Sequence, residues 1–414
     1  MTGCRPGPAR QWWQGLLETL VNTGNEIILV AGALCVAAIL AGQVSARVGT
    51  PLLLVFIGLG ALAGEDGPGG IAFDDFGTAY LVGSLALAVI LFEGGLGTDR
   101  SMVRRAWGPA ALLATVGVAV SAVVVGAAAV ALFGVSWPEG LLLGAVLAPT
   151  DAAAVAVLLR LSPVNVPPRV VAVLEVESGL NDPMSVFLTV ALIAILAQPG
   201  SLSISHAALL FAEEMAGGAA AGVAGGWALV WLFRRLSAEP ALFPVLALGG
   251  ALVLFGGCQV LGTSGFLAVY VAGLLVGNSH SPASAGVPRF FNALGWLAQI
   301  ALFLMLGLLV TPHELPHVVG PALLIAVVLI AVARPLAVSA CLLPFRWRPA
   351  EVAFVSWVGL RGAVPIYLTI VSLLAGVHQA RTLFDVAFVA VVASVALQGW
   401  TISPAARLLR LDRG

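Results

Sequence analysis

Long apolar runs, bounded by Gly, Pro or Arg, are the feature that most constrains what this chain can fold into. Most of them reach about 20 residues, the length that an α-helix needs to cross the hydrocarbon core of a bilayer. Across the chain 60% of residues are hydrophobic and only 9% are charged, whereas a soluble domain carries about 25% charged residues. The short alternating segments of a membrane β-barrel are missing from the sequence. The sequence therefore predicts an all-α polytopic membrane protein.

The same runs predict about thirteen transmembrane helices. The weakest boundary lies between the eighth and the ninth, because only Gly262-Thr263-Ser264 separates them. The expected spans are residues 26–46, 50–64, 77–97, 109–134, 138–160, 169–197, 206–233, 240–261, 263–279, 290–310, 317–344, 350–376 and 382–406.

The placement of the basic residues predicts the orientation of these spans. With the N-terminus outside, 14 of the 19 basic residues fall in cytoplasmic segments, and only Arg5, Arg10 and Arg381 fall outside. The positive-inside rule gives this asymmetry for an odd number of spans, so we expect an N-out, C-in topology. The expected segments are an extracytoplasmic tail (1–25), a transmembrane exchanger domain (26–406) and a short cytoplasmic tail without a regulatory domain (407–414).

Two of the spans carry residues that interrupt a helix. The fifth contains Ala148-Pro149-Thr150-Asp151, and the twelfth contains Gly359-Leu-Arg-Gly-Ala-Val-Pro365. Proline removes a helical N–H and frees carbonyl groups upstream, which in a membrane must find another partner. The interrupted spans are seven apart in order, which fits two inverted repeats joined by a linking helix. Paired interruptions of this kind indicate the binding site of a transporter, whereas kinks used only for packing are the alternative.

The sixth span contains the polar run Leu174-Glu-Val-Glu-Ser-Gly-Leu-Asn-Asp-Pro183. A carboxylate at membrane depth costs about 2.5–3.5 kcal/mol on insertion scales, so such a group usually handles an ion or a proton. Ser178, Asn181 and Asp182 are spaced by three or four residues and can share one helical face. Their hydroxyl, amide and carboxylate oxygens suit an alkali cation. Glu175 lies nearer the cytoplasmic end, where a solvated charge is the simpler interpretation.

The residues around the first interruption add to this site. Asp151 follows the break directly, and Thr150 offers a hydroxyl and a carbonyl oxygen. In a low-dielectric setting Asp151 and Asp182 repel each other, so each is stable either with a proton or beside a cation. Proton and cation then compete for the same oxygens, which is sufficient for exchange when it is combined with alternating access.

Three further charges inside or near the spans need an interpretation. Arg361 requires a buried partner, and Glu177 is the best candidate for a structural ion pair. Arg334 has no obvious acidic partner; carbonyls of an unwound helix or Glu175 are the alternatives. Glu93 ends the third span and is either a cytoplasmic entry group or a solvated helix end.

At these motifs the chain resembles bacterial monovalent cation:proton antiporters of the NhaP-like family. Pro149-Thr-Asp151 is similar to the motif of that family's fifth helix, and Glu177-Ser-Gly-Leu-Asn-Asp182 to its sixth-helix Asn-Asp motif. Phe92-Glu-Gly-Gly-Leu-Gly-Thr-Asp99 and the run from Gly359 to Pro365 match further family segments. The longer string from Glu177 to Thr189 is most similar to the cell-volume (CvrA-like) potassium/proton type, which commonly continues into a cytosolic regulatory domain.

The resemblance implies an NhaA-like antiporter fold in the bacterial cytoplasmic (inner) membrane, a homodimer, and a core domain that moves against a dimer domain. It implies that Asp151 and Asp182 bind cation and proton, and that Asn181 is associated with electroneutral exchange. The remaining roles that it implies are cation ligands at Ser178 and Thr150, a cytoplasmic role for Glu93, and a structural ion pair of Glu177 with Arg361.

The expected function is a secondary antiporter that exchanges protons for K⁺ or Na⁺, and the oxygen types alone do not distinguish the two ions. Its expected partners are these ions, a second copy of the chain and membrane lipids, with no nucleic acid and no cofactor. A cation channel would need an open polar pore or a ring of filter residues. A membrane-embedded enzyme would need a nucleophile–base pair or a metal cluster, and neither is visible in the sequence.

Overall fold

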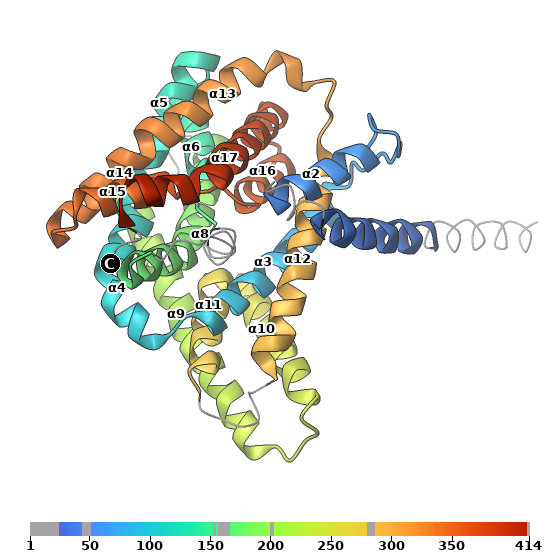
Figure 1. The fold of residues 1–414 in the computed structure, drawn as a ribbon, viewed down its shortest axis with the longest axis vertical. Helices are drawn as coiled ribbons and strands as arrows, with labels where there is room; N and C mark the ends of the chain where they lie inside the picture. The colour runs from blue at the N-terminus through green and yellow to red at the C-terminus, as the bar shows by residue number, and fades with distance from the viewer. Residues whose placement is uncertain are drawn as a thin grey trace, which may run out of the picture.

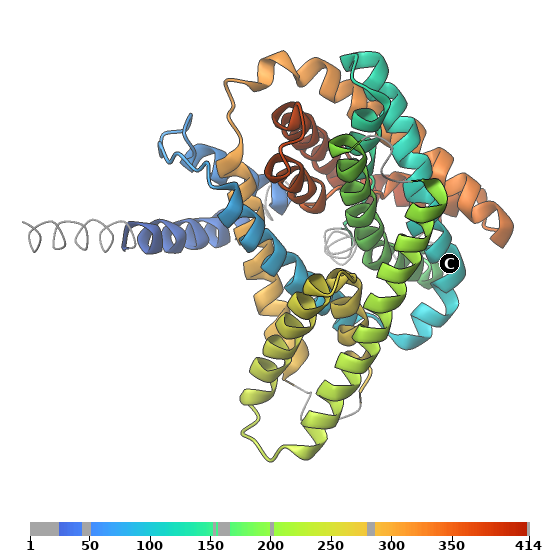
Figure 2. The same ribbon diagram turned by 180° about the vertical axis from the view of Figure 1, so that it is seen from behind.

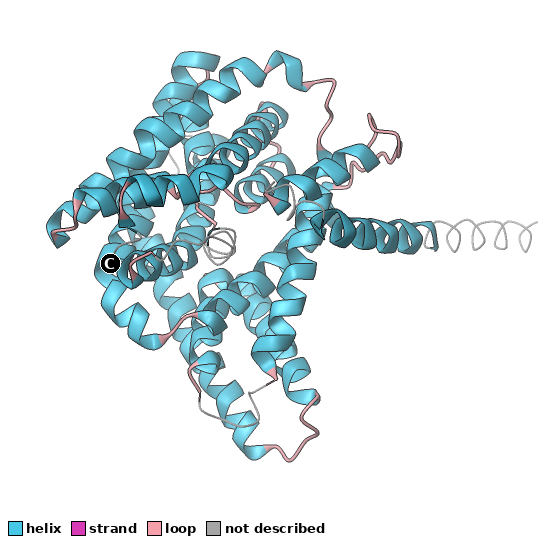
Figure 3. Ribbon diagram, viewed as in Figure 1, coloured by secondary structure: helices cyan, strands magenta, loops and turns pink. Residues whose placement is uncertain are grey.

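The structure is a computed structural model that describes residues 25–43, 51–151, 155, 166–198, 203–279 and 286–411. These residues form helices joined by short loops, with one isolated β-bridge between Gly64 and Ile71 and no strand (Figure 3). In this part of the chain nine helices are long and apolar enough to cross a membrane, and four shorter apolar helices accompany them. The prediction of an all-α polytopic membrane protein is confirmed.

One group of helices packs around α3 and α11. Gly95 of α3 and Gly273 of α11 lie against backbone atoms of the opposite helix, and an added Cβ would meet a carbonyl oxygen at 2.2 and 2.3 Å. Small residues at such positions let two membrane helices approach closely. The helix Asn25–Gln43 projects from this group and is exposed along most of its length (Figure 1). The group consists of α2 (Leu52–Ala63), α3 (Phe76–Gly97), α9 (Ile204–Arg235), α10 (Leu242–Val260), α11 (Gly265–Gly277) and α12 (Val287–Leu309).

A second group packs around α8 and α5. The long helix α9 leads from this group back to the first, and Figure 2 shows it from behind as it runs past α8 and α11. Two π-helical segments interrupt otherwise continuous helices here. The group consists of α4 (Arg100–Leu112), the π segment η1 (Leu113–Gly117), α5 (Val118–Phe133), α6 (Trp137–Leu147), α8 (Pro168–Ala197), α13 (Val319–Val328), the π segment η4 (Leu329–Ala333), α14 (Arg334–Leu342), α15 (Pro349–Trp357), α16 (Val364–Leu374) and α17 (Ala380–Leu408).

Both predicted interruptions are present. α6 ends at Leu147 and the chain leaves the helix at residues 148–151; the second half of that expected span lies outside the described residues, apart from Val155. α15 ends at Trp357, residues 358–363 are not helical, and α16 begins at Val364. Each break leaves backbone groups without helical partners, and these become available to bind one another or a ligand.

Candidate functional site

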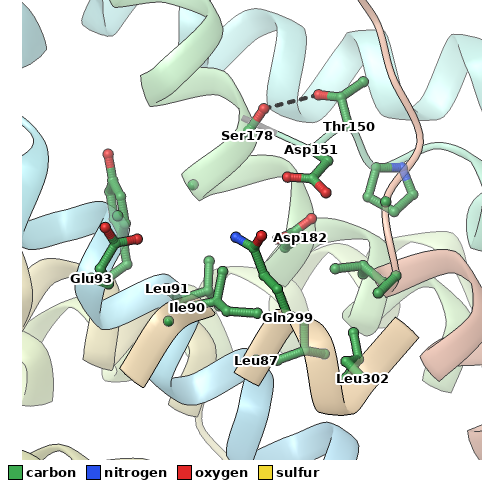
Figure 4. Close-up of a pocket in the computed structure, with 18 of the residues that line it drawn as sticks. Leu87, Ile90, Leu91, Glu93, Thr150, Asp151, Ser178, Asp182, Gln299 and Leu302 are labelled. Carbon is green, nitrogen blue, oxygen red and sulfur yellow. Dashed lines mark hydrogen bonds between the residues drawn. The ribbon is translucent and has the colours of Figure 1, made fainter. Parts of the chain in front are cut away.

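A cavity of about 420 Å³ lies where the two groups of helices meet. It is lined by side chains of α3, α8, α11 and α12 and by both helix breaks (Figure 4). Most of the lining is apolar, with a small number of polar groups, as is usual for a site that binds a small ligand. Six of the residues predicted from the sequence line it, namely Glu93, Thr150, Asp151, Glu175, Ser178 and Asp182.

Asp182 lies at the centre of α8 and faces this cavity. Its side chain is 92% buried, and its Oδ1 atom has no hydrogen-bond partner among the described residues. Pro183 follows inside the same helix. A proline has no N–H, so the carbonyl of Gly179, which also lines the cavity, receives no helical hydrogen bond from it. A carboxylate oxygen and a main-chain oxygen are thus both available next to the cavity.

Thr150 is held in place by two residues of α8. Its Oγ1 atom accepts a hydrogen bond from the amide of Asn181 at 2.8 Å and lies 3.1 Å from the hydroxyl of Ser178 (Figure 4). Asn181 itself is buried and does not line the cavity. The amide therefore contacts the site through Thr150, whereas the sequence placed Asn181 among the direct ligands.

Asp151 joins the first break to the second. Its backbone N–H donates to the carbonyl oxygen of Leu360 at 2.9 Å, and its carboxylate lies beside Asp182 in the cavity (Figure 4). Gly362 leaves room for that carboxylate, because an added Cβ would lie 2.2 Å from Oδ2 of Asp151. The two carboxylates that the sequence singled out therefore meet in one cavity.

The predicted ion pair between Glu177 and Arg361 is wrong, because Arg334 is the partner of Glu177. Both terminal guanidinium nitrogens of Arg334 donate to the carboxylate of Glu177, Nη2 over 2.9 Å, and the two side chains are 4% and 1% exposed. Arg334 begins α14 directly after the π segment η4. Gly359 leaves room for it, since an added Cβ would lie 2.8 Å from its Nε atom. A bidentate pair of this kind limits the cost of burying two charges.

Arg361 takes the role that the sequence offered to Arg334. Its guanidinium donates to the carbonyl oxygens of Ala148 and Pro149, the latter at 3.0 Å. The backbone N–H of Arg361 donates to Ser394 of α17 at 3.2 Å. Arg361 therefore satisfies carbonyls that the first break leaves without helical partners. Sequence spacing alone could not assign the two arginines, because the partner of Glu177 depends on contacts between distant helices.

Glu93 lines the cavity away from the two aspartates, near the end of α3 at Gly97 (Figure 4), and Glu175 lines it about two turns before Asp182 on α8. Gln299 and Asn292 of α12 also line the cavity and were not predicted from the sequence. An amide in the middle of an apolar span was the available signal for Gln299, whose side chain points towards Asp182 in Figure 4. The cavity thus has carboxylates at both ends and an amide between them.

This arrangement suits a monovalent cation or a proton. The oxygens come from carboxylates, hydroxyls and main-chain carbonyls, which are ligands for hard cations. Within the described residues no group of three or more His, Cys, Asp or Glu side chains could hold a metal ion. Two adjacent carboxylates repel each other when both are ionised, and either a cation or a proton relieves that repulsion.

The sequence matches the family described as "Sodium/hydrogen exchanger, transmembrane" over residues 33–408. The chain belongs to this family. The K(+)/H(+) antiporter NhaP of Alkalimonas amylolytica is 46% identical over 388 residues, which cover 94% of this chain and 67% of the relative. The K(+)/H(+) antiporter NhaP2 of Shewanella sp. (strain ANA-3) is 44% identical over 391 residues, which cover 94% and 68%.

A more distant relative agrees with this assignment. The Na(+)/H(+) antiporter NhaP of Pseudomonas aeruginosa is 31% identical over 345 residues, which cover 78% of this chain and 79% of the relative. The structure of the sodium proton antiporter MjNhaP1 from Methanocaldococcus jannaschii at pH 8 superposes with a TM-score of 0.80 at 24% identity, over 92% of this chain and 98% of that one, which supports the fold. The expected family is thereby confirmed, as is the expectation of a cation/proton antiporter rather than an enzyme.

Proposed function

We propose that this protein exchanges K⁺ for H⁺ by alternating access, and that Asp151 and Asp182 bind the two ions in competition. The observation that carries the proposal is the pair of carboxylates in one cavity, with Oδ1 of Asp182 unpartnered among the described residues. A proton on one carboxylate, or a cation between both, relieves their repulsion, and the two states exclude each other. Ser178 and Thr150 supply further oxygens, and Asn181 orients Thr150.

The two groups of helices supply the moving parts in this proposal. The second group carries both aspartates, and the first group contributes the opposite wall of the cavity through α3, α11 and α12. Movement of one group against the other would expose the aspartates to each side of the membrane in turn. We further propose electroneutral exchange, because the residue before Asp182 is the neutral Asn181 and places no second carboxylate beside Asp182.

K⁺ is the proposed cation because relatives at 43–46% identity are named K(+)/H(+) antiporters. Na⁺ is the second candidate, since the Pseudomonas aeruginosa relative at 31% identity is named a Na(+)/H(+) antiporter. Both ions accept hard-oxygen ligands, so the size of the closed site decides between them.

The surrounding organisation is also a proposal. We place the exchanger domain at residues 26–406, with thirteen spans expected from the sequence, inverted repeats as in the NhaA-like fold, and an N-out, C-in orientation in the bacterial inner membrane. The tail 1–25 then lies outside and residues 407–414 lie in the cytoplasm. A homodimer would leave the second group free to move while the first group forms the contact between copies.

Purified protein in liposomes with an internal pH dye tests the function. With an outward proton gradient imposed, addition of K⁺ should collapse the gradient at a rate that saturates with K⁺, and Na⁺ should act more weakly. An imposed membrane potential of either sign should leave the rate unchanged if exchange is electroneutral. A larger response to Na⁺ would reverse the proposed selectivity, and no response to either ion would refute the antiport mechanism.

A further inference from the structure

A line of polar side chains continues along α8 beyond the cavity. Ser178 and Asp182 line the cavity, and Ser185 and Thr189 follow on the next turns without lining it. With 3.6 residues per turn, these four positions fall within an arc of about 60° and extend for about 16 Å along the helix. The helix therefore presents one continuous polar face, of which only the first half reaches the cavity.

The hydroxyl groups of Ser185 and Thr189 make no hydrogen bond to the described residues in this conformation. Both are fully buried, and neither hydroxyl oxygen has a hydrogen-bond partner among the described residues. Other hydroxyls in these helices donate to the carbonyl one turn back, as Ser372 donates to Leu368 at 3.1 Å. A buried hydroxyl without a partner lowers stability. Two of them in succession, next to the unpartnered oxygen of Asp182, point to a second conformation in which they meet a polar species.

Aromatic side chains lie between the two groups of helices on the side of the cavity where α3 begins. The hydroxyl of Tyr367, on α16 of the second group, lies 3.0 Å from Oγ of Ser84 on α3. Its ring stacks on Tyr80 with centroids 5.6 Å apart and meets the edge of Phe266 at 6.1 Å. Ser84 lies one turn before Leu87, which lines the cavity. Tyr367 therefore fills the space between the two groups directly beyond the cavity.

We propose that Ser185 and Thr189 line the outer half of the ion pathway, and that the Tyr367–Ser84 contact seals this half in the present conformation. The outer end is the end at which α3 begins and α8 finishes at Ala197. The inference rests on the proposed function, because a cation passing from Asp182 towards that end would exchange its water for hydroxyl oxygens. When the second group moves, Tyr367 leaves α3 and the hydroxyls of α8 gain a partner.

Access of a charged thiol reagent tests the pathway. In a variant in which the four native cysteines are replaced by serine, Ser185→Cys and Thr189→Cys are each introduced. A positively charged methanethiosulfonate, added outside intact cells while exchange proceeds, should label both and block exchange. Val190→Cys is the matched control, because Val190 lies at the same depth but is 51% exposed on the outside of the bundle. A thiol that faces lipid stays unreactive.

The contact between Tyr367 and Ser84 is tested in the same cysteine variants. Tyr367→Phe and Ser84→Ala remove the same hydrogen bond from opposite sides, so each should favour the open state and raise the labelling rate of Ser185→Cys on the order of fivefold. Thr189→Val replaces the hydroxyl by a methyl group of the same shape. It should raise the melting temperature, because a costly buried hydroxyl is removed, and lower the exchange rate; unchanged exchange in Thr189→Val would reduce that hydroxyl to a packing role.

Labelling of the introduced cysteines and ion exchange are measured separately, so the two proposals can fail separately. Exchange by the cysteine variants without external labelling at either position would overturn the pathway while leaving the proposed function intact. Equal labelling of Val190→Cys would also overturn it, since access would then not depend on the helix face. Labelling of Ser185→Cys and Thr189→Cys in a protein that shows no exchange with either ion would retain the pathway and refute the antiport mechanism instead.

Discussion

The backbone N–H of Asp151 donates to the carbonyl oxygen of Leu360 at 2.9 Å, which joins two helix breaks that are far apart in the sequence. In return, the guanidinium of Arg361, the residue after Leu360, donates to the carbonyl oxygens of Ala148 and Pro149. Each break therefore satisfies backbone groups that the other leaves open, and lipid could not do so. The crossing also sets the position of the Asp151 carboxylate, on which the proposed exchange depends.

Replacement of Asp182 by asparagine should reduce exchange to the background of protein-free liposomes. The amide keeps the shape of the side chain but can neither release a proton nor neutralise a cation. The liposome assay with K⁺ and Na⁺ measures the effect, and gel filtration in detergent checks the fold. Glu214→Gln on α9 is the matched control, because this partly buried carboxylate does not line the cavity and its loss should leave exchange unchanged. Exchange by Asp182→Asn at the normal rate would refute the role of that carboxylate.

Glu177 and Arg334 should be energetically coupled, whereas Glu177 and Arg361 should not. Loss of one partner from a buried pair costs about 3–5 kcal/mol, because the other charge stays buried alone. We expect Glu177→Gln and Arg334→Gln each to lower the free energy of unfolding by about that amount, and the double variant to cost less than the sum. Thermal unfolding in detergent measures this cycle. A parallel cycle with Arg361→Gln should be additive; strong coupling there would restore the pairing expected from the sequence.

Gly362→Ala should impair exchange without preventing folding. The new Cβ would lie 2.2 Å from Oδ2 of Asp151, so the carboxylate must shift. A displacement of about 1 Å at a binding group can cost about 100-fold in rate, and we expect a loss of that order. The initial rate of K⁺-driven pH change measures it. Gly256→Ala on α10 is the control, since its added Cβ meets no atom within 4 Å; equal losses in both variants would mean that Asp151 is not the cause.

The contact between Asp66 and His313 should depend on pH. Backbone and side-chain hydrogen bonds from His313 lower the pKa of Asp66, and the hydrogen bond and charge of Asp66 raise the pKa of His313. The raised pKa of His313 means that its stabilisation is present below its ordinary pKa of about 6.5 and is lost as the pH rises through the raised value. The lowered pKa of Asp66 means that its stabilisation is present above about 3.9 and is lost as the pH falls through the lowered value. The contact should therefore be strongest between about pH 4 and 6.5.

An NMR titration of ¹³C-labelled histidine rings checks this, with His313→Asn used to assign the signal among five histidines. Asp66→Asn should bring the midpoint of His313 back towards its ordinary value. A midpoint that is the same in both proteins would show that the two loops do not interact in solution.

The sequence by itself determined the all-helical membrane architecture, because runs of about 20 apolar residues can satisfy their backbone in lipid only as helices. It also located both helix breaks, since Pro149 and the glycines near Pro365 remove or weaken helical hydrogen bonds wherever they stand. Asp151 and Asp182 were identified for the same reason: a carboxylate in an apolar span is costly in any fold. These are local properties that one segment carries alone.

The tertiary structure decided which groups meet. The sequence paired Glu177 with Arg361, whereas in the folded chain Arg334 at the start of α14 reaches Glu177 and Gly359 leaves room for it. The contact between α8 and the first break places Asn181 behind Thr150, and α12 brings Gln299 to the cavity. The seal of Tyr367 on Ser84 likewise depends on how two groups of helices lie against each other. Pairings of this kind are set by contacts between distant segments, and the residue pattern within one span carries no information about those contacts.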